Sequence, residues 1–423
     1  MAEEQDLSTA TDEVIHETVL AWLKDNWRTD RPLAEWRNIL VDGGWAAPDW
    51  PTECYGRGFS LAQAQVVQRA FREVGAVGAA LGGPGNLAAH TILAHGNEAQ
   101  KHRYLRPILT GEHAWCQLFS EPGSGSDLAG LTTRAKRDGD NYIINGQKVW
   151  NTSAHHADFG ILVARTDWDA PKHQGISYFL INMRQPGVEV RPLRQMNGHA
   201  SFNEVFLTDA LVPVTDRLGN EGDGWRIASS TLSAERQAFS RDRGIGTLRE
   251  REGTIYAEYA AEQAIAQEPY TWYPQRAGRV DLALPRAMAT GAIRDPVVRQ
   301  ELARLLCLAH AAEYAAASAA ATRRAGSNTI VPAGSIAKLT ASLIARQASH
   351  VHTLVSGPEA MLGGSDGPMD GVIAEILLSV PAISIAGGTD EIQKNIISER
   401  VLGLPKEPRF DTGPFRDIPR NAS

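Results

Sequence analysis

The stretch of this chain with the clearest chemical character is a loop rich in glycine and serine, Phe119–Asp127, with the sequence FSEPGSGSD. Its two inner glycines let backbone amides approach a bound group closely, because no Cβ stands in the way. Successive N–H groups, together with the hydroxyls of Ser120, Ser124 and Ser126, can hold an anion or a polar heterocycle. On composition alone, a plain turn is the better interpretation. The loop is therefore a candidate binding site whose ligand it does not itself identify.

Familiar nucleotide and metal motifs are absent. The sequence has no GxGxxG after a strand, no GxxxxGK[ST] and no HExxH, which argues against nucleotide folds of the Rossmann or P-loop type. Close histidine pairs occur only at 155–156 and 350–352, and neighbours at those spacings on a strand or helix do not readily converge on one ion. We expect surface or helix-end positions for them and no metal site.

The segments after the loop indicate whether it is a plain turn or a binding site. Leu128–Ala135 and then Asn145–Thr152 come next, and their order and spacing resemble the acyl-CoA dehydrogenase family of flavoproteins, especially its actinobacterial fatty-acid and sterol-degrading branch. Together the motifs are specific, and they imply FAD as cofactor, an acyl-CoA substrate and an electron-transfer flavoprotein as acceptor. The resemblance extends over nearly the whole chain through His95–Glu112, Phe202–Leu207, Gly222–Trp225 and Gly387–Arg400.

The resemblance assigns roles to individual residues. On one side, the flavin ring and pyrophosphate would be lined by Gln117, Phe119, Ser120 and Ser126, and Ser126 would also lie near the acyl-CoA phosphates. From the other side of the isoalloxazine, Trp150 and Thr152 would stack on it and hydrogen-bond it. Thr389 would touch FAD from the last helical segment.

The family reaction needs a carboxylate that removes the α-proton of the thioester while the β-hydride passes to flavin N5. Most members carry this base in a Tyr-Glu-Gly-Thr motif, but the sequence here is Ala-Gly-Gly-Thr, with Gly387 at the glutamate position. A minority, similar to the isovaleryl and long-chain enzymes, present a glutamate from an earlier helix in a Leu-x-x-Glu-Arg motif, which Leu232–Arg236 matches. Glu235 is therefore the candidate base. A solvated Glu-Arg pair on a helix surface is the alternative.

Gly387 would keep one function despite its missing side chain. In the family, the backbone N–H at this position and a flavin ribityl hydroxyl hold the thioester oxygen, and glycine retains that N–H. The lost side chain would open volume beside the substrate α-carbon for a carboxylate from the facing helix. Arg236 would be either the ion-pair partner of Glu235 or a contact near the CoA moiety.

One family feature is missing. Members usually place an Arg-x-x-Phe-Gly finger against the FAD of the partner subunit, whereas this chain has Ala292–Gln300 there, with the sequence AIRDPVVRQ. Arg294 is a candidate for the lost cation. Asp295 and Pro296 are expected to start the next helix, since proline suits the first helical position.

Hydrophobic periodicity predicts an α+β chain of helices, then sheet, then helices. The fold class implied is a helical N-terminal domain (1–114), a β-barrel-like central domain (115–218), a C-terminal four-helix bundle (219–405) and a polar tail (406–423) that extends over a surface. Within 263–291, three prolines around an aromatic cluster predict an irregular loop. Strands are expected over 142–146, 159–164, 176–182 and 188–193, and long helices over 298–324 and 336–355.

Composition narrows the class of protein further. The 423 residues are 43% hydrophobic and 22% charged, which is ordinary globular composition. A net charge of −7 provides no global positive field for nucleic acid or an anionic membrane. Three well-separated cysteines fit a reducing compartment, and the acidic N-terminus resembles no targeting signal. With no apolar run of about 18 residues, no membrane insertion is expected. We expect a cytoplasmic protein of lipid metabolism.

Two other functions keep the same fold. A flavin-dependent monooxygenase would also lack the Tyr-Glu-Gly-Thr glutamate, and so would an inactive subunit of a hetero-oligomeric dehydrogenase. Family members are usually homodimers or tetramers built through their C-terminal helices. Acyl chain length, branching and a possible sterol side chain depend on cavity volume, which motifs do not encode.

Overall fold

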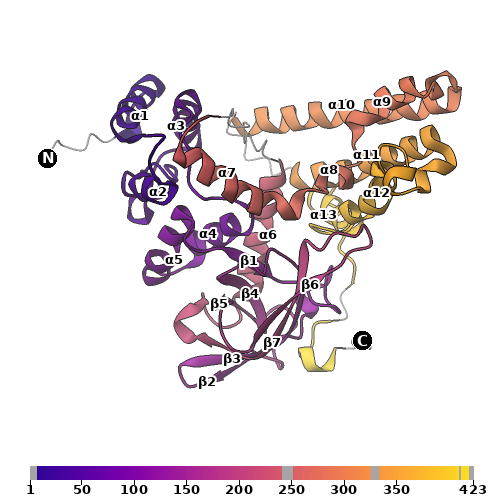
Figure 1. The fold of residues 1–423 in the computed structure, drawn as a ribbon. Coiled ribbons are helices and arrows are strands. Elements are labelled where there is room, and N and C mark those ends of the chain that lie inside the picture. Colours follow the sequence, from indigo (N-terminus) through magenta and orange to yellow (C-terminus); the bar gives the residue numbers. More distant parts are fainter. Residues whose placement is uncertain (1–6, 241–250, 325–332, 409–410, 419–423) are drawn as a thin grey trace.

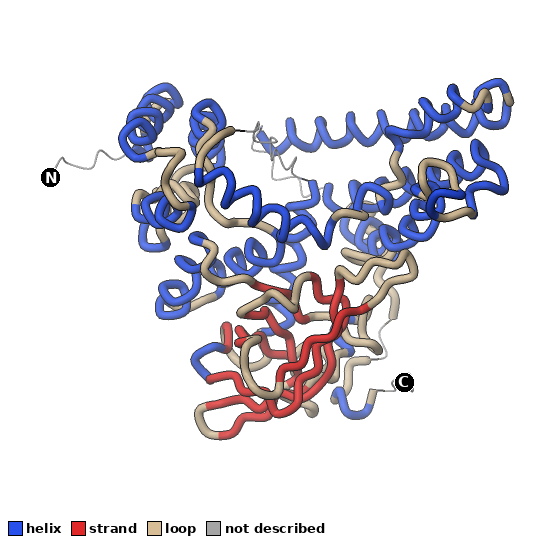
Figure 2. Tube along the Cα trace, in the orientation of Figure 1, coloured by secondary structure: helices blue, strands red, loops and turns tan. Residues whose placement is uncertain are grey.

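The computed structural model describes residues 7–240, 251–324, 333–408 and 411–418. Figure 1 shows the helices of the N-terminal and C-terminal thirds side by side, with the sheet domain below them. In Figure 2 the strands gather in a single body while nearly all long helices lie outside it. This order of helices, sheet and helices confirms the predicted fold class.

Three of the five N-terminal helices begin at side-chain caps. Ser60 and Gln63 form a capping box at one helix start, and Asn97 and Gln100 form another. A cluster of tryptophans fills the core between these helices, where the fully buried Trp36 lies 4.8 Å from Trp27 between ring centroids. The helices are α1 (Asp12–Asn26), α2 (Leu33–Asp42), α3 (Leu61–Val74), α4 (Gly83–His95) and α5 (Glu98–Thr110).

Helix α7 (Thr254–Gln267) comes late in the sequence but packs against these N-terminal helices. Ile255 and Tyr256 are buried in the same core cluster. At the surface of that contact, Arg37 of α2 donates from Nη2 to Glu262 Oε1 of α7 at 2.7 Å. The chain therefore returns to its first helical layer after leaving the sheet.

The central domain is one mixed sheet of eight strands in the order β6-β7-β3-β2-β4-β5-β8, with β1 paired parallel to β4. All four segments predicted to be strands are confirmed. The strands are β1 (Trp115–Leu118), β2 (Arg134–Asp138), β3 (Asn141–Thr152), β4 (Phe159–Arg165), β5 (Ile176–Asn182), β6 (Val188–Leu193), β7 (Phe202–Pro213) and β8 (Arg217–Leu218).

Strands β4 and β5 are buried on both faces, which explains their continuous apolar sequences. On one face, Ile161 and Tyr178 join the core cluster that includes Tyr104 of α5. On the other, Leu162 and Phe179 pack with residues of β3 and β7. The two strands thus form the layer on which the helices above the sheet rest.

Helix α11 is central to the C-terminal region, since it contacts α6, α9, α10, α12 and α13. The predicted helix start at Asp295 is confirmed, because Asp295 Oδ1 accepts from Val297 N at 2.7 Å. Within the described ranges, no helix is long and apolar enough to cross a bilayer. The helices are α6 (Gly224–Ser240), α8 (Tyr273–Arg276), α9 (Val280–Ala289), α10 (Pro296–Arg324), α11 (Ala333–Ser356), α12 (Val372–Ser379) and α13 (Asp390–Arg400).

The prediction of an irregular loop over 263–291 is wrong, because most of this segment is helical. Pro269 and Pro274 lie in the first turns of short helices, where a missing N–H leaves no hydrogen bond unmade. The aromatic cluster is a packing anchor. Trp272 is 1% exposed and donates from Nε1 to Ser201 Oγ at 2.8 Å, which ties this segment to the loop before β7.

Candidate active site

A buried carboxylate closes the base of the Gly/Ser loop. Glu121 Oε2 accepts from the backbone N–H of Thr132 at 2.7 Å, and Oε1 accepts from that of Thr133 at 2.9 Å. Lys148 of β3 donates from Nζ to Glu121 Oε1 at 2.9 Å and to the carbonyl of Phe119 at 3.0 Å. One ion pair therefore joins both ends of the loop to the strand beneath it.

The pair is well shielded from water. The Lys148 side chain is 0% exposed and the Glu121 side chain 5%. Burial alone would raise the pKa of Glu121, but Lys148 and the hydrogen bonds from Thr132 and Thr133 outweigh it and lower that pKa to about 2. Burial lowers the pKa of Lys148, and the facing carboxylate partly offsets this effect. Each charge is tolerated only because the other is present.

Within the loop, Ser124 has a structural role, whereas Ser126 is exposed. Ser124 is buried, and its hydroxyl donates to the Asp127 carbonyl at 2.5 Å, so the expectation that Ser124 binds a ligand is wrong. Gly125 and Ser126 are exposed, and within the described residues their backbone N–H groups donate to no other group. The loop thus presents free donors on its outer side.

A β-bulge exposes the predicted flavin tryptophan. The pairing of β3 with β7 shifts register between Val149 and Asn151, and Trp150 has a φ of +64°. Trp150 is consequently 55% exposed, with its ring at 5.8 Å from Phe202. Asn151 turns inward and donates from Nδ2 to the Gln117 carbonyl at 2.7 Å. Bulges are common beside active sites, where they re-aim a side chain in this way.

The other residues predicted to line the flavin lie on these same elements. Phe119 follows β1 and is buried, whereas Gln117, Ser120 and Thr152 are partly exposed at the ends of β1 and β3. In the described part of the chain, the side-chain polar atoms of Gln117, Ser120, Ser126 and Thr152 have no hydrogen-bond partner.

Helix α6 carries the candidate base, and buried hydroxyls fix the helix in place. Thr231 Oγ1 lies 2.8 Å from Thr91 Oγ1 of α4 and 3.2 Å from the hydroxyl of Tyr178 in β5. The ring of Tyr178 also meets Phe119 edge-on at 5.9 Å between centroids. The helix and the end of β1 therefore pack around one tyrosine, and Figure 1 shows α6 above the sheet, where it contacts β4 and β5.

Glu235 lies four residues after Thr231, so it is on the same face of α6 one turn further on. It is partly buried. This placement disfavours the alternative of a fully solvated surface pair. The side chain of Arg236 lies outside the described residues, and its predicted roles stay predictions.

Gly387 lies in a loop between residues 384 and 390 whose carbonyls are turned inward. Gln393 Nε2 donates to the Gly387 carbonyl at 3.0 Å, and Asp390 is held by Lys338 and Arg346 of α11, each at 3.0 Å. The N–H of Gly387 has no acceptor within the described residues. A Cβ built on Gly387 would meet nothing within 4 Å. The position thus has a free backbone donor beside open space, and its role toward a thioester stays a prediction.

Thr389 caps the next helix, α13. Its Oγ1 accepts from Ile392 N at 3.2 Å, which leaves the hydroxyl proton free to donate. Arg294 is exposed at the α9–α10 corner, and Figure 1 places this corner far from the sheet. Any contact of Arg294 with a flavin would therefore involve a second copy of the chain, and that contact stays a prediction.

The exposed groups suit a flavin. Unpaired N–H and hydroxyl donors in the Gly/Ser loop match a pyrophosphate, and unpaired polar side chains at the strand ends match the edge of a flat heterocycle. Trp150 supplies a bare aromatic face for stacking.

Several supporting residues escaped sequence reasoning, including Glu121, Lys148, Thr231 and Gln393. A signal existed for Lys148, because a lysine inside a strand next to apolar Val149 implies a buried partner. No pattern marks Thr231 or Gln393, since their partners come from distant parts of the chain.

Replacing Lys148 by Met should lower the free energy of unfolding by about 3–5 kcal/mol, because the buried Glu121 carboxylate loses its partner. Urea denaturation measures this loss. Lys136→Met, on the exposed part of β2, is the matched control and should change stability by no more than about 0.5 kcal/mol. Equal effects of the two substitutions would contradict the assignment of the ion pair.

The depressed pKa of Glu121 also predicts acid sensitivity. Its folded value of about 2 lies below the ordinary 4.5, so the carboxylate's contribution is complete above the ordinary value and is lost as the pH falls toward the folded one. Between about pH 5 and about pH 3, the wild type should lose more unfolding free energy than Glu121→Gln. Denaturant titration at each pH measures the free energy of unfolding. If this free energy falls in parallel for the two proteins, the predicted acid sensitivity of Glu121 is wrong.

Sequence comparisons identify the family. Models of three acyl-CoA dehydrogenase domains match in order: the N-terminal domain at residues 1–112, the middle domain at 116–210 and the C-terminal domain at 280–402. Acyl-CoA dehydrogenase IpdE1 of Mycobacterium tuberculosis is 35% identical over 375 residues, which cover 88% of both chains. Acyl-CoA dehydrogenase FadE34 of the same organism is 37% identical. The alignment covers 87% of this chain but only 46% of the length of FadE34.

Solved structures agree. Acyl-CoA dehydrogenase from Geobacillus kaustophilus has a TM-score of 0.60 and 26% identity, covering 93% of this chain and 98% of that one. The Tcur3481-Tcur3483 steroid ACAD shares the fold, with a TM-score of 0.63, 23% identity and coverage of 94% and 98%. The expected oxidoreductase class and FAD cofactor are confirmed with the family. The exposed tryptophan, the free amides of the Gly/Ser loop and the domain matches lead to one conclusion: the chain belongs to the acyl-CoA dehydrogenase family.

Proposed function

We propose that this protein catalyses the FAD-dependent α,β-dehydrogenation of an acyl-CoA thioester with Glu235 as the base. The observation that carries the proposal is the hydroxyl cluster at Thr231, which fixes the inward face of α6 against Tyr178 and, through that ring, beside Phe119. Glu235 continues that face by one turn. A carboxylate on a helix held this way would be directed toward the strand ends that we propose bind the flavin.

The thioester carbonyl would be polarised by the N–H of Gly387. Gln393 binds the Gly387 carbonyl, and Asp390 ties the loop to α11, so this N–H is directed before substrate arrives. Preorganised donors of this kind stabilise developing negative charge without rearrangement during the reaction. Open space at the missing side chain leaves room for the α-carbon and for a carboxylate from another helix.

Bound FAD supplies the hydride acceptor. Gly125 and Ser126 would hold its pyrophosphate through their free N–H groups, and Ser126 would also lie near the CoA phosphates. Trp150 would stack on the ring system while Thr152 and Thr389 donate hydrogen bonds to it. Glu235 takes the α-proton and becomes a neutral acid. Electrons would then leave to an electron-transfer flavoprotein.

The decisive test compares wild type with Glu235→Gln. Anaerobic addition of an acyl-CoA panel should bleach the flavin absorbance of the wild type, and the variant should bleach about 10²–10⁴-fold more slowly because general-base catalysis is lost. Glu73→Gln on α3, whose partner is His16 of α1, is the matched control and should bleach at the wild-type rate. Unchanged bleaching in Glu235→Gln would remove the base assignment.

The same preparations separate the two alternative functions. A monooxygenase would show no bleaching with any acyl-CoA but would consume oxygen and substrate when a reductase supplies reduced flavin. An inactive subunit of a mixed enzyme would retain FAD only after a second polypeptide is added. Electron-transfer flavoprotein added after bleaching should restore the oxidised spectrum under the proposed function.

We infer that the chain assembles into a homodimer or homotetramer through α10. In the described part of this helix, the second half is largely exposed, and Tyr314 is 74% exposed in an alanine-rich stretch. Alanine allows close approach of a second helix. Light scattering of the purified chain should give the mass of a dimer or tetramer, and Tyr314→Arg should shift it toward the monomer. A monomeric wild type would contradict this assembly.

A further inference from the structure

Residues 411–418, which come after α13 in the sequence, are seated on the sheet domain. Phe415 is 1% exposed, and its N–H donates to the Ala170 carbonyl at 3.0 Å. Pro414 forms a bridge with Pro171 beside it. In Figure 1 the chain crosses from the last helix to this distant edge of the sheet. Segment 411–418, here called the strap, therefore has a specific binding position.

Arg165 connects the strap to the Gly/Ser loop. This fully buried residue of β4 donates from Nη2 to the Ala129 carbonyl at 2.6 Å and from Nε to the Leu131 carbonyl at 3.1 Å. Its guanidinium carbon lies 3.3 Å from the ring centroid of Phe415. The group that fixes the segment directly after the loop is thus covered by a residue of the strap.

Lys172 makes a second connection between the same two segments. Its Nζ donates to Asp127 Oδ2 of the loop at 2.6 Å and to Asp411 Oδ2 of the strap at 3.4 Å. The Lys172 side chain is only 10% exposed, so one ammonium group with little access to water serves both segments. Asp127 directly follows the outward-facing Ser126.

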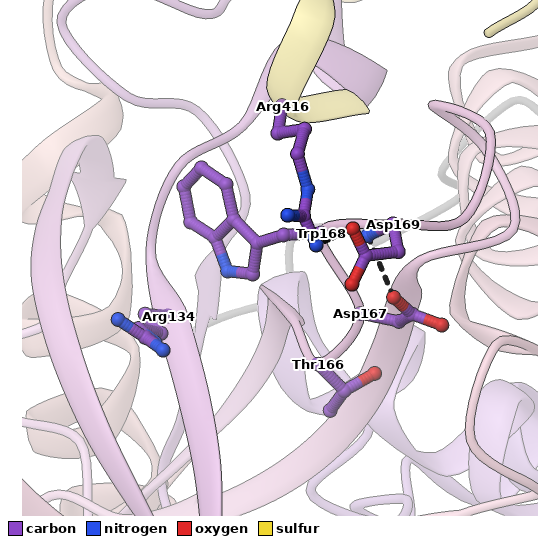
Figure 3. A pocket seen from close by; sticks show the side chains of 6 residues that line it. All are labelled: Arg134, Thr166, Asp167, Trp168, Asp169 and Arg416. Carbon is purple, nitrogen blue, oxygen red and sulfur yellow. Dashed lines mark hydrogen bonds and ion pairs between the residues drawn. The ribbon is translucent and has the colours of Figure 1, made fainter. Parts of the chain in front are cut away.

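Figure 3 shows the solvent side of the strap. Arg416 extends beside Trp168 toward Asp169, over a cavity of about 510 Å³. Arg416 pairs with Asp169, and both side chains are more than half exposed. Exposed pairs of this kind contribute little. Arg416 makes none of the contacts to the loop, so it offers a control within the strap itself.

We propose that the strap positions the FAD-binding loop, with Phe415 and Asp411 as positioning residues that act through Arg165 and Lys172. This inference rests on the proposed function of the loop. Without Phe415, the cover over the Arg165 guanidinium is lost, and water and other rotamers become accessible to it. The carbonyls of Ala129 and Leu131 then lose their fixed donor. The free amides of the loop would sample more positions, and each bound FAD would have to order them.

The test measures FAD binding and local hydrogen exchange in the full chain. Phe415→Ala should raise the FAD dissociation constant about two- to tenfold, the scale of typical coupling between contiguous sites. Amides of residues 122–131 should exchange roughly tenfold faster without FAD, whereas those of α1 to α3 stay unchanged. Arg416→Ala should leave both quantities within about twofold of wild type, since its exposed pair contributes little.

Asp411→Ala keeps the proposal testable if Phe415→Ala does not fold, because it removes the strap's contact with Lys172 and leaves Phe415 in place. It should shift both quantities in the same direction by a smaller factor. Wild-type FAD affinity and wild-type loop exchange in the variants that fold would overturn the proposal. If the wild type itself binds no FAD, the proposed function fails, and loop exchange alone then decides whether the strap orders the loop.

Discussion

The ion pair between Lys148 and Glu121 is the interaction on which the rest of the site depends. It is formed away from water and joins the start of the Gly/Ser loop, the segment that follows the loop and strand β3. Neither charge would be stable there alone. Because β3 also carries the bulge at Trp150, the same strand sets both the loop and the exposed aromatic ring. Two parts of the proposed cofactor site thus depend on the same strand.

Much of the architecture could be predicted because local patterns determined it. The apolar sequences of β4 and β5 and the start of α10 at Asp295 each arise from short stretches of sequence with an evident physical cause. The segment 263–291 could not be predicted this way, since prolines at helix starts and prolines in loops look alike. Its state depends on the burial of Trp272 against Ser201, which is a long-range contact.

The residues of the candidate site also fall into two groups, those that local motifs predict and those that depend on long-range contacts. Motifs gave the residues that face outward, namely Ser126, Trp150 and Gly387, and the structure finds an exposed ring or unpaired amides at each. Motifs did not reveal the residues that orient these three positions. The inward hydroxyl of Ser124 and the bulge before Asn151 depend on backbone geometry, whereas the hydroxyl cluster at Thr231 joins segments separated by 140 residues. Residue types along one stretch cannot encode such partners.

The conformation of Gly387 has a consequence for substitutions at this position. Its φ of +69° and the φ of +88° at Gly388 lie where residues with a Cβ are strained by roughly 1–3 kcal/mol. A mutation that returned glutamate to position 387 would find empty space but an unfavourable backbone. A glutamate at position 387 would therefore require the backbone of this loop to change as well as the side chain.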